Sequence, residues 1–507
     1  MNDRQTQIQL TSDSLQGLDE VVSYYDQGQY IRAYHIGTEH LGPIESWPGV
    51  RGRILAGRVA YNLGAPRWAQ AWHLRVCREF PDDPESIYYQ HSSMIGRRGA
   101  IAVWRSLTQS PFPEYLTDRQ RAELLGLRAH VFAILRDFSS AQADLQEALR
   151  LAPDHVWILV DQHAVLAAMD RREEALESTA RALETRPYYR PAVQSHAYQL
   201  VQLNRDDEAE SLLRRGAEYN QSGDLWSQLV ALYYETERYA EAEECLRRAE
   251  ANYILRDRDK GLKKWLAGRN SDLAYRRGDY AEAIRLAEQV DTPFFKSLTQ
   301  SMREALEQPE REYRRVLLNV HFVRQHHMTC APATLTALAG YWNHPVDHVE
   351  LAQSICYDGT PGHEERNWAD TNGFATREFR VTWDNARALI DQGIPLTLTT
   401  IGPQTGHLQP IIGYDERRGV LLVRDPGERH HVEYRAQELL DHFSSSGPRG
   451  MAMVPCEEAA RLKGINLEGA EFYDLVYALQ RALDVHDRAA AAARLADLQK
   501  LDATHRL

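Results

Sequence analysis

Apolar and polar residues alternate with two different periods along this chain. In the first three hundred positions the apolar residues recur at helical spacing, and the segments RDDEAESLLRRGAE (205–218) and RYAEAEECLRRAE (238–250) repeat one helical face. From residue 316 onward the pattern changes to short apolar or β-branched runs separated by Gly, Pro and Asp, which are strand signals. The pattern therefore predicts a helical part followed by a part that contains strands.

The helical part repeats with a fixed period. Ala141 and Ala175 are each followed twelve positions later by a proline, and the two copies are 34 residues apart. Ala209 and Ala242 continue the series. This pattern resembles tetratricopeptide repeats, in which small residues lie where two helices of a hairpin touch.

The resemblance implies helical hairpins that stack into a right-handed solenoid, because each hairpin leaves an apolar face that only its neighbours can bury. A generic helical bundle is the alternative. Tyr233, Tyr234 and Tyr239 either line a peptide groove of the array or belong to its core.

The second part mixes helical and strand patterns, which predicts an α+β domain with an antiparallel sheet. The expected helices cover 331–342, 348–356, 363–373 and 383–393. The expected strands lie in VLLNVHFVRQ (316–325), IPLTLTT (394–400), HLQPIIGYD (407–415) and GVLLVRDP (419–426).

These patterns divide the chain into five predicted segments. They are an N-terminal segment (1–17), the repeats (18–300), a linker helix (301–315), the α+β domain (316–455) and a tail of two amphipathic helices (456–507). The tail either packs on the array or mediates self-association.

Composition excludes several classes of protein. The net charge of -13 and the scattered basic residues argue against a nucleic-acid partner. No segment approaches the roughly 18 apolar residues of a membrane helix, so we expect a cytoplasmic protein without a membrane partner. The five cysteines form no CxxC pair, which fits neither a disulfide framework nor a zinc finger.

Candidate chemistry begins at Cys330. Pro332 suits the first turn of a helix, which places Cys330 at a helix N-terminus, where the helix dipole favours a thiolate. His407 begins a predicted strand, and Asp425 ends the next one, so an antiparallel hairpin brings the two side by side. We therefore predict acyl transfer through a thioester, with Cys330 as nucleophile, His407 as proton carrier and Asp425 orienting the imidazole. Gln325 is the expected oxyanion donor beside the Cys330 backbone N–H.

This arrangement resembles the papain-like superfamily, and most closely the bacteriocin-processing (double-glycine) cysteine peptidases. The matching residues are Gln325, Cys330-Ala331-Pro332-Ala333, His407 with Gly413-Tyr414-Asp415, and Asp425-Pro426. The resemblance implies a papain-like cysteine peptidase domain. Ala331 departs from it, because active members usually have Gly there, which affects how closely a substrate approaches the thiol. The Cys-to-His separation of 77 residues is also shorter than the roughly 130 to 150 of papain.

The sequence thus predicts a cysteine peptidase or related acyl transferase that acts on a peptide or protein held by the repeats. The alternatives are a scaffold with a degenerate peptidase domain that only binds peptides, and an amide- or isopeptide-forming transferase. No cofactor is expected. Cys77, Cys245, Cys356 and Cys456 are expected to have no chemical role, and His326–His327, His430–His431 and His363 lack a metal-binding spacing.

Overall fold

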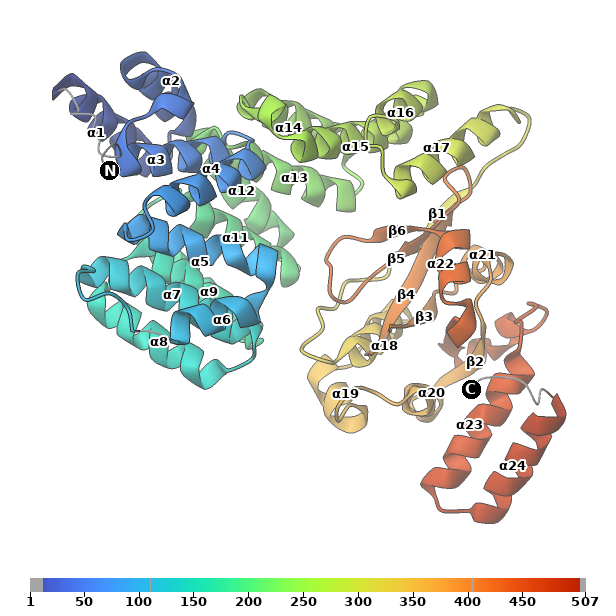
Figure 1. Cartoon of the computed structure of the whole chain (residues 1–507). Helices are drawn as coiled ribbons and strands as arrows, with labels where there is room; N and C mark the ends of the chain where they lie inside the picture. Colours follow the sequence, from blue (N-terminus) through green and yellow to red (C-terminus); the bar gives the residue numbers. More distant parts are fainter. Residues whose placement is uncertain (1–11, 110, 403–404, 502–507) are drawn as a thin grey trace, which may run out of the picture. The chain divides into compact units, whose positions relative to one another are not determined.

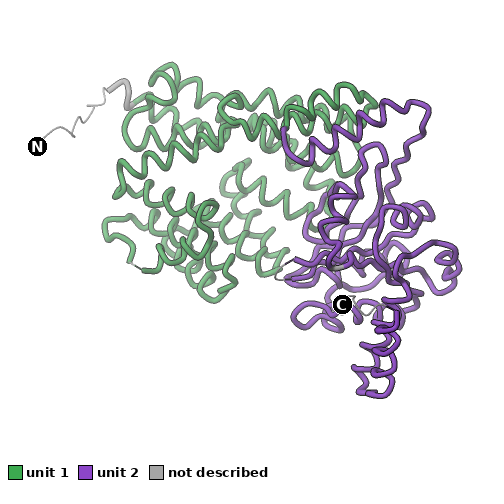
Figure 2. Tube along the Cα trace, turned by 45° about the vertical axis from the view of Figure 1, so that its right-hand side comes forward, with its two compact units in different colours: residues 1–290 green, residues 291–507 purple. Residues whose placement is uncertain are grey.

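The chain forms two compact units, Met1–Val290 and Asp291–Leu507, in a computed structural model (Figure 1). The structure describes residues 12–109, 111–402 and 405–501. Most of the expected N-terminal segment (1–17) and the last residues of the expected tail (502–507) lie outside these ranges. Figure 2 colours the two units separately. Within the described ranges, no helix combines the length and the apolar composition needed to span a bilayer.

Unit 1 is all-helical, and consecutive helices pack against each other as hairpins (Figure 1). Its α-helices are α1 (Ser12–Asp26), α2 (Tyr30–Leu41), α3 (Gly49–Asn62), α4 (Pro66–Glu79), α5 (Pro84–Arg98), α6 (Ala100–Thr108), α7 (Asp118–Ile134), α8 (Phe138–Leu151), α9 (Val156–Ala168), α10 (Arg172–Thr185), α11 (Arg190–Gln202), α12 (Asp206–Asn220), α13 (Gly223–Glu235), α14 (Tyr239–Asn252), α15 (Lys260–Arg276) and α16 (Tyr280–Ala287). The predicted helical solenoid is confirmed.

The 34-residue period corresponds to one hairpin. Ala141, Ala175, Ala209 and Ala242 are completely buried, as expected where a small side chain lets two helices approach closely. The turns repeat with the same period, because a left-handed residue ends the first helix of each of these hairpins. These left-handed residues are Arg136, Asp170, Asn204 and Glu237, with φ between 57° and 61°. Tyr233 is fully buried in the core of the array.

Unit 2 contains an antiparallel sheet and helices. Its helices are α17 (Pro293–Leu306), α18 (Cys330–Tyr341), α19 (His348–Ile355), α20 (Gly362–Thr371), α21 (Trp383–Asp391), α22 (Ala436–His442), α23 (Ala470–Asp484) and α24 (Arg488–Leu501). Its strands are β1 (Arg315–Leu317), β2 (Phe374–Arg380), β3 (Leu396–Ile401), β4 (Gly406–Asp415), β5 (Val420–Val423), β6 (Val432–Arg435) and β7 (Arg449–Pro455). The expected boundary at residue 300 falls inside α17.

The strand order is β2-β7-β3-β4-β5-β6, and β1 pairs with β4. Inward-facing residues such as Leu396, Ile411 and Val423 are completely buried and form the core beneath α21. In the register Thr400 lies opposite His407, and Ile411 lies opposite Val423. The α+β fold predicted for this part is therefore confirmed.

Two local predictions differ from the structure. The strand expected over 316–325 ends at Leu317, because the Val320 N–H bonds back to the Leu318 carbonyl (2.8 Å) in a tight turn that breaks the ladder. Strands β2, β6 and β7 and helix α22 were not expected. The two tail helices pack within unit 2, where Asp474 of α23 pairs with Arg366 of α20 (2.8 Å).

Candidate active site

Cys330 is the first residue of α18, as the sequence predicted. The loop before it is held by Thr329, whose hydroxyl oxygen accepts a hydrogen bond from the His326 backbone N–H (2.8 Å) and lies 3.0 Å from Nε2 of His348. The first N–H groups of a helix have no partner within the helix, and they carry the positive end of its dipole. The half-buried Cys330 thiol therefore lies at an electropositive backbone terminus.

The position of α18 on the sheet is fixed by a buried side chain. Thr334, one turn after Cys330 and 1% exposed, donates its hydroxyl proton to the carbonyl of Leu408 (3.0 Å). Leu408 is the neighbour of His407 on β4. A single buried hydrogen bond thus connects the helix that carries the thiol with the strand that carries the imidazole. Sequence reasoning missed Thr334, because a threonine in an apolar helix gives no local sign of its partner.

His407 and Asp425 lie side by side. The imidazole Nε2 is 3.0 Å from Oδ2 of Asp425, and the two side chains are 32% and 17% exposed. Asp425 follows β5 by two residues, and its Oδ1 accepts the Gly427 backbone N–H (2.6 Å). Because Nε2 is used by Asp425, Nδ1 is the nitrogen that remains for the thiol of Cys330.

The electrostatics of the three groups are coupled. Partial burial alone would lower the pKa of His407, but hydrogen bonds to Asp425 and Cys330 outweigh this effect and raise the pKa to about 10. Burial opposes ionisation of Asp425, yet the hydrogen bond from His407 and the charge of Arg324 keep its pKa below the usual value. The imidazole is therefore held in its cationic form at neutral pH.

Gln325 lies in the loop between β1 and α18. Its backbone N–H donates to the carbonyl of Pro426 (3.0 Å), which joins this loop to the turn that carries Asp425. Arg324 strengthens the same junction through a hydrogen bond to the Gly427 carbonyl. The oxyanion role of the Gln325 side chain stays a prediction. Arg324 was missed, since its partner is a backbone carbonyl about a hundred residues away.

The other cysteines occupy different environments. Cys77 and Cys245 are buried in unit 1, and burial raises the pKa of each thiol to about 11. Cys356 is half-buried and its thiol bonds to the Met328 carbonyl (3.3 Å), whereas Cys456 is exposed. Cys456 begins the short 3-10 helix η4 (Cys456–Leu462), but among the described contacts no hydrogen bond joins any of these four cysteines to a histidine.

In the described part of the chain, one group of side chains has the spacing of a metal site. It comprises His363, Glu364 and Asp484. The guanidinium of Arg481 already lies 3.5 Å from Asp484 and 3.9 Å from Glu364, so a cationic side chain neutralises these carboxylates. His326, which is also one of the histidines considered in the sequence, is not part of this group. Its ring packs edge-on against the ring of His348, with 5.0 Å between the ring centroids.

Two known protein families match separate parts of the chain. Residues 317–447 match the Peptidase_C39 like family, and residues 122–155 match a tetratricopeptide repeat. The resemblances expected from the sequence are confirmed. No curated protein matches the chain.

Several solved structures are similar to parts of the chain. The peptidase domain of Streptococcus ComA, described as a bifunctional ABC transporter involved in quorum sensing, is 17% identical, with a TM-score of 0.23, and the match covers 27% of this chain and 99% of that domain. A tetratricopeptide repeat protein from Parabacteroides merdae is 12% identical, with a TM-score of 0.31, and the match covers 57% of this chain and 98% of that one. The Cut9–Hcn1 assembly gives 11% identity, a TM-score of 0.35 and coverage of 71% and 66%.

Proposed function

We propose that the chain is a cysteine peptidase or related acyl transferase, with Cys330, His407 and Asp425 as its catalytic residues. The observation that carries this proposal is the position of His407, which hydrogen-bonds Asp425 (3.0 Å) and lies near enough to Cys330 for the thiol to help raise the pKa of the imidazole. A cysteine that serves only packing does not require a neighbouring imidazolium that is itself bonded to a carboxylate. The arrangement around Cys330 therefore favours a chemical role. The match of residues 317–447 to the Peptidase_C39 like family supports the same reaction class.

The proposed reaction proceeds through a thioester. The Cys330 thiolate attacks the substrate carbonyl carbon, and the carbonyl π electrons move to the oxygen, which the backbone N–H of Cys330 and the amide of Gln325 stabilise. His407 then gives its proton to the departing amine as the C–N bond breaks. Water, activated by the now neutral His407, hydrolyses the thioester and releases the acid. An amine in place of water gives the transferase outcome.

The environment of Ala331 favours an active enzyme over a degenerate one. Ala331 is only 2% exposed, so its methyl group is packed in the interior of unit 2. A methyl group that is buried adds little to the surface that a substrate would meet. The departure from the usual Gly is therefore compatible with an active enzyme.

The repeats of unit 1 supply recruitment in this proposal, because tethering a weakly bound substrate raises its concentration near the peptidase domain. We propose a peptide or protein as the recruited partner. The repeat match at residues 122–155 supports this class of partner.

The test is labelling of the thiols by an electrophilic probe at neutral pH, followed by mass mapping of the modified residues. We expect Cys330 to be labelled first, because the imidazolium of His407 stabilises the thiolate. Cys456 serves as an internal control, since it is exposed but lacks a histidine partner. Cys77 and Cys245 should not react.

The His407→Ala variant is the matched control. It should shift the rising part of the pH profile of Cys330 labelling to higher pH and leave the profile of Cys456 unchanged. Equal labelling rates for Cys330 and Cys456, or the same Cys330 profile with and without His407, would instead support a non-enzymatic scaffold.

A further inference from the structure

The C-terminal helices α23 and α24 form the same kind of hairpin as the repeats of unit 1, although the α+β part of the chain lies between them. His486 connects the two helices and has a left-handed backbone (φ 57°), as does the residue at this place in the hairpins of unit 1. The N–H of the next residue, Asp487, donates to the Ala482 carbonyl (2.8 Å), just as the N–H of Arg205 donates to the Leu200 carbonyl (2.9 Å) in unit 1. Helices α23 and α24 therefore have the geometry of a further repeat.

The small residue of the hairpin contact is present as well. In unit 1 a buried alanine follows the left-handed residue by five positions, as Ala209 follows Asn204. Ala491 follows His486 by the same number of positions and is also buried. The two helices thus touch as they do in the repeats, and each residue of α24 has a counterpart in unit 1.

One leucine of this hairpin differs from its counterparts in exposure. In unit 1 the residue four positions after the buried alanine is itself buried. These residues are Leu145 (4% exposed), Thr179 (0%), Leu213 (1%) and Leu246 (1%). Leu495 takes the same place in α24 and is 48% exposed. The face around Leu495 is therefore one that the array buries and this hairpin does not.

In unit 1 the following hairpin helps to cover this position. Leu145 shares an apolar core with Ile158 of α9, and Leu213 shares one with Leu229 of α13, where α9 and α13 each begin the next hairpin. Among the described residues α24 is the last helix, and it packs mainly on α23 (Figure 1). Since a repeat hairpin has an apolar face that a neighbour buries, the exposed face of α24 is a docking surface for another helix.

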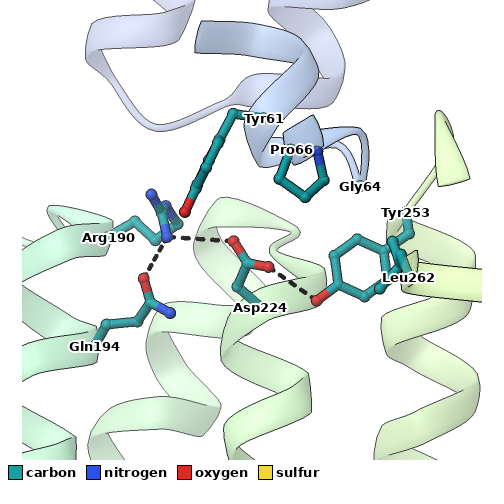
Figure 3. A pocket seen from close by; sticks show the side chains of 8 residues that line it. All are labelled: Tyr61, Gly64, Pro66, Arg190, Gln194, Asp224, Tyr253 and Leu262. Carbon is teal, nitrogen blue, oxygen red and sulfur yellow. Dashed lines mark hydrogen bonds and ion pairs between the residues drawn. The ribbon is translucent and has the colours of Figure 1, made fainter. Parts of the chain in front are cut away.

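Polar side chains show the same difference between the array and the C-terminal hairpin. Figure 3 shows a link between successive hairpins of unit 1, in which the Arg190 guanidinium of α11 lies 3.2 Å from Asp224 of α13. In α24, Arg494 and Lys500 instead pair within their own helix, since each lies 3.4 Å from Asp497. Exposed pairs of this kind contribute little energy, so they leave the face available to a partner.

The shape of this face is complementary to a second copy of itself. Beside Leu495 it carries three exposed alanines at helical spacing, Ala489, Ala492 and Ala496. In an antiparallel pair of α24 helices that is centred near the middle of the helix, Leu495 of each copy meets Ala492 of the other. Small side chains at such a contact let two helices approach closely and leave room for the leucine.

The charges of this segment favour the same antiparallel pair. The chain has a net charge of -13, but residues 484–501 carry three acidic and three basic side chains, so two copies of the segment do not repel each other. Residues 484–488 leave one negative charge at the start of α24, and residues 494–500 leave one positive charge toward its end. Antiparallel pairing sets the negative end of each helix against the positive end of the other.

We infer that two copies of the chain associate through their C-terminal hairpins, with the two α24 helices antiparallel. One self-complementary surface is then used twice, as in the two-fold symmetric dimers that are the commonest homo-oligomers. A single pair of short helices gives an interface at the small end of the known range, so we expect a Kd on the order of 10 µM. The association requires neither catalysis nor the proposed function.

Sedimentation equilibrium of the full chain measures the association. Wild type should pass from monomer to dimer between about 1 µM and about 200 µM. Leu495→Glu buries a charge on both sides of the contact and should raise the Kd at least about tenfold. Leu306→Glu is the matched control, because Leu306 is 44% exposed at the end of α17 and lies outside the hairpin, so the Kd should not change. Circular dichroism verifies that both variants are folded.

Disulfide cross-linking locates the contact. Ala492→Cys, combined with Cys456→Ser to remove an exposed thiol, should form a disulfide-linked dimer under mild oxidation. Ala240→Cys in the same background, at an exposed alanine of unit 1, should remain a monomer on a non-reducing gel. A wild type that is monomeric at about 200 µM, the same Kd in Leu495→Glu and Leu306→Glu, or a dimer that Ala492→Cys does not cross-link would overturn the inference.

Discussion

Replacing Asp425 by Asn removes a negative charge from the imidazole of His407 and keeps the size of the side chain. Asp425 contacts Nε2 of His407 at 3.0 Å, and this contact helps raise the pKa of His407 to about 10. A hydrogen bond between charged groups contributes about 1.5–3 kcal/mol, which corresponds to about one to two pH units. We therefore expect the pKa of His407 to fall by about that amount in Asp425→Asn. Turnover should fall by orders of magnitude, with little change in substrate affinity.

The assay is an NMR titration of ¹³C-labelled histidine in four proteins, namely wild type, Asp425→Asn, Cys330→Ala and the double variant. The cycle separates the effect of the carboxylate from that of the thiol, because both groups raise the pKa of His407. Asp441→Asn, at an exposed position of α22, is the control and should leave the titration unchanged. If His407 titrates at the same pH in Asp425→Asn and wild type, the carboxylate does not hold the imidazolium and the reasoning fails.

The contact between His407 and Asp425 also predicts how the free energy of unfolding depends on pH. The folded pKa of His407 lies above its unfolded value of about 6.5, so its stabilising contribution is complete below that pH and is lost as the pH rises toward about 10. The loss of unfolding free energy in Asp425→Asn should therefore be larger at pH 6 than at pH 10. Urea denaturation at the two pH values measures this difference.

Three further outcomes are expected. Cys330→Ala should abolish peptidase or transferase activity and change the free energy of unfolding by less than about 1 kcal/mol, as measured by urea denaturation, because the thiol is only half-buried. Ala209→Leu should destabilise the array by about 1–3 kcal/mol through overpacking, whereas Ala240→Leu, at an exposed position, should not; thermal melting compares the two. A fragment that ends at Val290 should fold alone with helical circular dichroism and cooperative unfolding, and an aggregated fragment would contradict the separation of the units.

The repeats could be predicted from sequence because their information is local and periodic. Each small residue such as Ala175 is required by the contact within its own hairpin, so the signal recurs every 34 residues. Helix α18 could also be predicted from local information, because its apolar run and the proline near its start indicate a helix within two turns. His407 and Asp425 were expected to meet because one antiparallel hairpin connects them, and β4 and β5 do form that hairpin.

Strand β2 could not be predicted in the same way, because its buried positions include charges. Glu378 is 4% exposed in the middle of FATREFR, a sequence that reads as a surface segment. Its carboxylate is paired with Arg366 and Arg449, both 3.4 Å away. Those partners come from α20 and β7, so the reason for burying Glu378 lies in residues distant in sequence. A single chain segment carries no sign of such a network.

The half-open cavity of about 690 Å³ in unit 1 was hidden from the sequence for a related reason. The tyrosines singled out from the sequence, such as Tyr233, occupy the core, whereas Tyr61 and Tyr89 line the cavity. Helical spacing identifies an apolar face, but it does not say whether that face packs on a neighbouring hairpin or lines an open cavity. The difference is made by contacts such as that between Asn220 and Gly28, which depend on the accumulated twist of many hairpins. The shape of the inner surface of such an array is therefore a property of how the superhelix closes, which no single repeat of the sequence encodes.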